Sequence, residues 1–125
     1  MKEIPDGIYI CKINKIERKE SKTGKEIVVI EFQITDETNQ YYNEKIYMTQ
    51  FINTPFGFHL LKDFFESLQT TLVFEDLKFG ETERLDSLID GIMGHTKLME
   101  FDIKQEAKGI FKTFTVEGIY DLIKV

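Results

Sequence analysis

The spacing of apolar residues changes twice along this chain, and the order of these changes limits the fold more than any other feature. Alternating apolar residues predict strands at about 8–17, 26–35 and 41–51. Thr54 and Pro55 then suit the start of a helix, and a second, shorter helix is expected from near Thr82, with Gly94 as its cap. Alternation returns at 95–105 and 110–122. We therefore predict a mainly β fold, a five-stranded OB-fold barrel with one or two helices inserted between strands 3 and 4.

The apolar pattern of the first strand is interrupted. Ile8 and Ile10 share one parity, whereas Cys11 and Ile13 share the other. Such a phase slip indicates a bulge or bend, which a strand needs if it serves two parts of a barrel.

Length and composition suit one compact domain, 1–125. The chain has 125 residues, of which 42% are hydrophobic, so it can bury a substantial core. Its single cysteine, Cys11, lies in an apolar strand pattern and is expected to be a buried thiol, without a disulfide or a cysteine zinc site. An 18-residue apolar run and a signal-peptide core are both missing from the sequence, so we expect a cytoplasmic protein with no membrane partner.

Charge is unevenly distributed along the chain. The net charge is −6, which argues against a simple polyanion binder. Residues 62–90, however, carry 8 acids and 3 bases, whereas residues 8–34 carry 6 bases and 4 acids. This distribution is compatible with a basic face opposite an acidic one.

In an OB-fold, ligands bind across strands 2 and 3, between the first-to-second and fourth-to-fifth loops. Both loops carry lysines in this sequence, and aromatic residues alternate along the third strand. Lysine and arginine neutralise phosphates, and an exposed ring can stack on any base. The residues predicted to bind nucleic acid in this way are Arg18, Lys22, Lys25, Lys45 and Lys108 for phosphates, and Tyr41, Tyr47 and Phe111 for bases. The other interpretation is a solvated loop of mixed charge and rings that merely cover the barrel.

The chain resembles a family of phage-encoded single-stranded-DNA-binding proteins with an OB-fold. The resemblance lies in Pro5-x-Gly7-x-Tyr9 at the first strand, in Ser21-Lys22-x-Gly24 before the apolar segment IVVIEFQI, and more weakly in Gly94-His95. It implies non-sequence-specific binding of single-stranded DNA during phage DNA replication or recombination in the host cell. Phage or host replication and recombination proteins would be its partners.

Catalysis is not expected. His59 and His95 lack the spacing of metal ligands, and the sequence contains neither a recognisable triad nor a glycine-rich phosphate loop. We therefore predict no cofactor, no metal and no enzyme activity. The alternative function is a protein-binding OB module, a phage inhibitor or adaptor that acts through the acidic segment 75–90. Pairing of the edge strand 110–122 between subunits could also produce a homo-oligomer.

Overall fold

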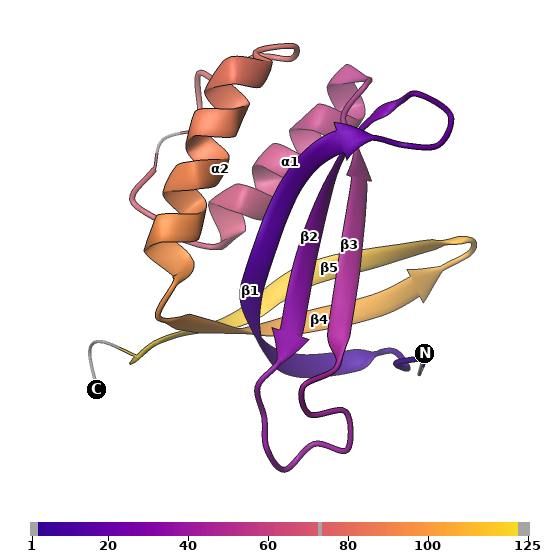
Figure 1. Cartoon of the computed structure of the whole chain (residues 1–125), viewed down its shortest axis with the longest axis vertical. Helices are drawn as coiled ribbons and strands as arrows, with labels where there is room; N and C mark the ends of the chain where they lie inside the picture. Colours follow the sequence, from indigo (N-terminus) through magenta and orange to yellow (C-terminus); the bar gives the residue numbers. More distant parts are fainter. Residues whose placement is uncertain (1–2, 73, 123–125) are drawn as a thin grey trace.

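The computed structural model describes residues 3–72 and 74–122, which form one five-stranded antiparallel sheet and two helices (Figure 1). The strands lie in the order β3-β2-β1-β4-β5. Their bounds are β1 Gly7–Glu20, β2 Glu26–Ile34, β3 Lys45–Phe51, β4 Met99–Lys108 and β5 Phe111–Asp121, and the helices are α1 Pro55–Ser67 and α2 Thr82–Thr96. The mainly β class and the order of elements are confirmed.

The sheet is strongly bent but not closed. The chain passes from the β1–β2–β3 part to the β4–β5 hairpin, which crosses behind it, while both helices lie along one side (Figure 1). β3 and β5 are the two edges of the sheet, with no ladder between them in the described residues. The arrangement is consistent with an OB-like fold, and closure of the five strands into a barrel is not shown among the described residues.

The predicted irregularity of β1 is a bulge at Asn14. Register against β2 shifts between Ile13 and Lys15, so that two residues of β1 oppose one position of β2. Before the bulge Cys11 and Ile13 are buried, and after it Ile16 is buried. The bulge therefore keeps apolar side chains on the inner face along the whole strand.

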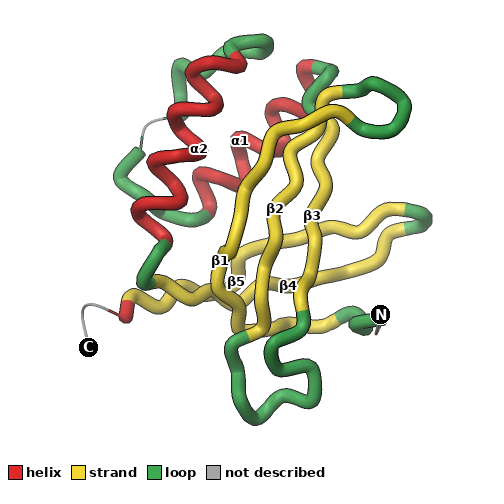
Figure 2. Tube along the Cα trace, in the orientation of Figure 1, coloured by secondary structure: helices red, strands yellow, loops and turns green. Residues whose placement is uncertain are grey.

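The third strand begins four residues later than predicted. Residues 35–44 form a loop with turns, in which the Tyr41 amide donates a hydrogen bond to the Asn39 side chain (2.8 Å) and Asn43 has φ of +69°. This left-handed residue is incompatible with an extended strand. Tyr41 consequently lies in the β2–β3 loop, shown in green in Figure 2, and not on β3.

Helix α1 starts as the sequence predicts. The Thr54 hydroxyl accepts a hydrogen bond from the Gly57 amide (3.1 Å), and Pro55 occupies the first turn, where its missing N–H costs nothing. Two large apolar residues of α1 are not in the core, however, because Phe56 is 72% exposed and Leu60 is 39% exposed. Helix α2 continues through Gly94 to Thr96, so Gly94 does not cap it.

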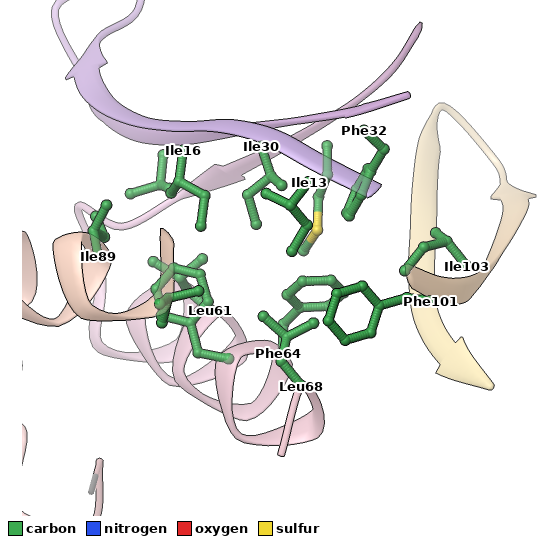
Figure 3. Packing of buried hydrophobic residues seen from close by; sticks show 14 of the residues in the cluster. Ile13, Ile16, Ile30, Phe32, Leu61, Phe64, Leu68, Ile89, Phe101 and Ile103 are labelled. Atoms are coloured by element: carbon green, nitrogen blue, oxygen red, sulfur yellow. The ribbon is translucent and has the colours of Figure 1, made fainter. Parts of the chain in front are cut away.

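One hydrophobic core joins the sheet to both helices. Side chains from the inner face of the sheet meet those of α1 and α2 (Figure 3), among them Ile13, Ile30, Phe32, Leu61, Phe64, Ile89 and Phe101. Cys11 belongs to this cluster, as predicted. The helices thus cover the inner face of the sheet and leave the outer face of β1–β3 to solvent.

Among the described residues, neither helix has the length and apolar character needed to cross a bilayer.

Candidate nucleic-acid interface

The solvent-exposed side of β1, β2 and β3, called the outer face below, is where the predicted ligand surface lies. Its residues follow from the register of the two ladders, since side chains directly across from one another share a face. Four cross-strand rows carry its charged and aromatic groups: Lys12–Gln33–Lys45, Lys15–Glu31–Tyr47, Glu17–Val29–Thr49 and Lys19–Ile27–Phe51. Lysines therefore flank aromatic rings on this face.

Tyr47 lies on the edge strand of the outer face, near the middle of β3, and is 49% exposed. Glu31 is its cross-strand neighbour, and that carboxylate accepts a hydrogen bond from Asn14 (3.1 Å) and lies 3.8 Å from the Lys45 ammonium. Lys15 lies across from Glu31, and its ammonium contacts Glu17 (3.1 Å), a hydrogen bond that raises the pKa of Lys15. A half-exposed ring between two lysines can accept a stacked base and leave its phosphates near positive charge.

Phe51 forms a second aromatic position at the other end of β3. It is 41% exposed, and the Lys25 ammonium lies 6.0 Å from its ring centroid, within range of a cation–π contact. Lys19 stands on the same cross-strand row, beyond the buried Ile27. Lys25 was predicted from the sequence to contact phosphate, but its contact with the Phe51 ring was not predicted.

Lys22 and Lys25 belong to the β1–β2 turn. The Ser21 amide donates to the Lys25 carbonyl (2.8 Å), and Gly24 adopts a φ of +79°, which explains a glycine at this place. Both lysines are exposed at this end of the sheet, and the structure brings Lys25 close to Phe51.

Arg18 does not join these lysines. Opposite Val28, which is fully buried, it points to the inner side, where its guanidinium donates two hydrogen bonds to Asp86 of α2 (2.8 and 2.9 Å) and one to Glu26 (3.0 Å). The hydrogen bonds from Arg18 lower the pKa of Asp86. Arg18 therefore ties β1 to α2, and its predicted phosphate contact would require breaking this pair.

Tyr41 is also separate from the outer face. Its ring is half-buried and meets the Tyr9 ring edge-on, with centroids 6.2 Å apart. The Tyr9 hydroxyl donates to the Pro5 carbonyl (2.6 Å), which anchors the N-terminal segment beside this loop. Tyr41 thus packs against the fold, and the predicted alignment of Tyr41 with Tyr47 on one strand is wrong.

Lys108 and Phe111 lie at the tip of the β4–β5 hairpin, directly opposite each other. They are far along the ribbon from the outer face, but Lys112 connects the two regions. Lys112 lines a depression of about 180 Å³ together with Lys45, Tyr47 and the acid Glu3. The start of β5 and the outer face therefore meet at this depression.

Two cations of this candidate interface were not predicted as site residues. Lys12 and Lys15 come from β1, a strand that was not expected to contribute its face. The relevant signal was the phase slip in β1, because a bulge at Asn14 places Lys15 and Lys19 outside and Arg18 inside.

The acidic segment lies on the helical side. Exposed carboxylates there include Glu66, Glu75, Glu83 and Asp90. Two other acids of this region are paired, Asp76 with Arg84 and Asp86 with Arg18. The acids of residues 62–90 thus lie in the helical part of the fold, which is compatible with the charge distribution in the sequence.

Comparison of the chain with protein-family models and with curated proteins found no match to either.

Proposed function

We propose that this protein binds single-stranded DNA without reading its sequence, through the outer face of β1–β3. The observation that carries the proposal is that Tyr47 and Phe51 share one face with lysines from β1, the β1–β2 turn and β3. Stacking on two rings is insensitive to base identity, and lysines neutralise phosphates regardless of sequence. We further propose that the strands belong to an OB-fold open between β3 and β5, acting as a binding module and not as an enzyme.

The negative net charge of −6 is compatible with this function because local potential governs the approach of a polyanion. On the outer face lysines outnumber the glutamates Glu17 and Glu31. Most exposed acids of the helices lie on the opposite side of the sheet, where they would repel DNA from the wrong surface. A role in phage DNA replication or recombination rests on the resemblance alone.

The test is titration of a fluorescent oligothymidine at several salt concentrations. If Lys12, Lys15, Lys19, Lys25 and Lys45 each neutralise one phosphate, log affinity should fall with log salt at a slope of about −3.5, from roughly −0.7 per contact on single strands. A duplex of the same length should compete poorly. Lack of any binding at low salt would refute the proposal.

Substitution of Tyr47 by alanine gives the sharper test. Loss of one stacked base costs about 1–3 kcal/mol, so affinity should fall by roughly 5- to 150-fold. Tyr42→Ala is the matched control, since Tyr42 is 42% exposed but lies in the β2–β3 loop and not on β3. Equal losses in both variants would show that Tyr47 has no specific part in binding.

The alternative, a protein-binding module that uses the acidic segment, has less support. Asp76 and Asp86 already pair with Arg84 and Arg18, and would have to leave these partners to meet a basic protein. Capture of a host protein after nuclease treatment, together with no oligonucleotide binding, would favour this alternative.

A further inference from the structure

The tip of the β4–β5 hairpin stands clear of the rest of the sheet (Figure 1). In the described sheet, the pairing of β4 with β1 ends at Gln105. Two residues further along β4, the Ala107 amide donates a hydrogen bond to the Asp6 carboxylate (3.0 Å). Pairing of β4 with β5 continues to Lys108 and Phe111. Beyond this anchor the hairpin is a two-stranded ribbon surrounded by solvent.

This ribbon ends in an apolar tip between cations. Gly109 has a φ of +66° and is followed by Ile110, the order that a two-residue type II′ turn requires. Ile110 is 93% exposed and Phe111 is 66% exposed. Lys108 lies across from Phe111, and Lys112 follows it along the chain. The tip therefore combines two apolar side chains with two ammonium groups.

A ligand for such a tip must offer a flat apolar surface next to negative charge. The end of a DNA duplex has both, because the terminal base pair is exposed and phosphates flank it. Proteins that contact or open base steps insert Phe, Ile or Leu side chains in this way. An anionic bilayer also combines apolar and negative groups, so position in the fold must decide between the two.

Position favours DNA. The depression lined by Lys45, Tyr47 and Lys112 lies between the outer face and the hairpin, so a strand bound to the outer face can continue to the hairpin past two lysines and one acid of the same lining, Glu3. The exposed acids of the helices are not on this route. A bilayer, in contrast, is normally engaged by the broad apolar face of an amphipathic helix, and this ribbon is narrow.

We propose that the hairpin tip recognises the junction between single-stranded and double-stranded DNA. Ile110 and Phe111 pack against the terminal base pair, and Lys108 and Lys112 meet the phosphates beside it. The inference rests on the proposed function, because the outer face holds the single strand that emerges from the junction.

The test compares two DNA ligands in parallel. One is a stem–loop with a single-stranded tail of about ten thymidines, a length within the range that one OB-fold covers, and the other is the tail alone. Contact with the terminal pair should make the tailed stem bind roughly tenfold more tightly than the tail, which is the size of one stacking contact.

Variants assign this preference to the tip. Ile110→Ser should lower the ratio of the two affinities and leave the affinity for the tail unchanged. Addition of Phe111→Ser should bring the ratio close to one. Leu98→Ser is the control, because Leu98 is 54% exposed but lies between α2 and β4, and it should keep the wild-type ratio.

Each outcome decides the inference. Equal affinity of the wild type for both ligands, or an unchanged ratio in the double variant, overturns it while the proposed function stands. Failure to bind either ligand removes both proposals. Binding to vesicles of anionic phospholipid that is lost in the double variant, without a preference for the tailed stem, assigns the tip to a membrane and overturns the inference.

Discussion

Gly57 is the position at which one added methyl group should be most informative. It lies in the first turn of α1, where the helix meets the end of β3. A β-carbon built there would lie 2.1 Å from the Phe51 carbonyl oxygen and 3.3 Å from the Thr54 hydroxyl oxygen. Carbon and oxygen normally approach to about 3.3 Å, so backbone must move by roughly 1 Å. Gly57→Ala should therefore separate the start of α1 from β3.

The free energy of this change is a balance of opposing effects. Overpacking costs about 1–3 kcal/mol, and weakening of the Thr54 cap costs about 0.5–2 kcal/mol. Replacing glycine by alanine in a helix stabilises the folded state by about 0.5–1 kcal/mol. We expect Gly57→Ala to lower the free energy of unfolding by about 2–3 kcal/mol, a large part of the roughly 5–15 kcal/mol of a typical domain.

Gly94→Ala is the matched control. Gly94 is also helical, but nothing lies within 4 Å of its added β-carbon, so only the helix preference should act. The free energy of unfolding of the Gly94→Ala variant should rise by about 0.5–1 kcal/mol. Urea unfolding followed by circular dichroism measures both. The reasoning is refuted if Gly57→Ala is as stable as the wild type, or shifts in the same direction as Gly94→Ala.

Three further predictions concern charge and burial. Lys15→Gln should make the salt slope of oligothymidine binding shallower by about 0.7, and an unchanged slope would remove Lys15 from the interface. The pKa of Asp86 is lowered in the folded state, chiefly by hydrogen bonds from Arg18, so this pair stabilises the fold above the unfolded pKa of about 3.9. That stability is lost as pH falls through the folded pKa. Asp86→Asn should therefore reduce the loss of unfolding free energy at acid pH. An identical loss in the variant and the wild type would contradict this. Burial raises the pKa of Cys11 to about 12, so Ellman's reagent should label its thiol only on unfolding, and rapid labelling of the native protein would disprove the burial.

Element order was predictable because period 2 and helical spacing differ strongly in this chain. The first turn of α1 was predictable from Thr54 and Pro55, whose roles are local. The start of β3 was not, because Tyr41 and Tyr42 have the side chains of strand residues while Asn39 and Asn43 impose turns. Local hydrogen bonds of asparagine overrode the β preference of the tyrosines.

The proposed binding face was less predictable than the fold because it depends on register between strands. Tyr47 and Lys45 could be assigned to one face from β3 alone. The contribution of Lys15 and Lys19 required the position of the β1 bulge and the pairing with β2, neither of which one strand's pattern supplies. Arg18 illustrates the same limit, since a basic residue near a basic loop turns inward to reach Asp86, 68 positions further along the chain.

The bulge at Asn14 also sets where this strand can change length. Two residues, Asn14 and Lys15, separate the inward-facing Ile13 and Ile16, whereas regular alternation needs one. A shortened chain lacking Asn14 would straighten the strand yet keep every later side chain on its present side. Loss of one residue between Ile16 and Lys19 would instead turn every later side chain of β1 to the opposite face of the sheet. Natural variants of this protein should therefore tolerate a gap at Asn14 and resist one in the four residues from Ile16 to Lys19.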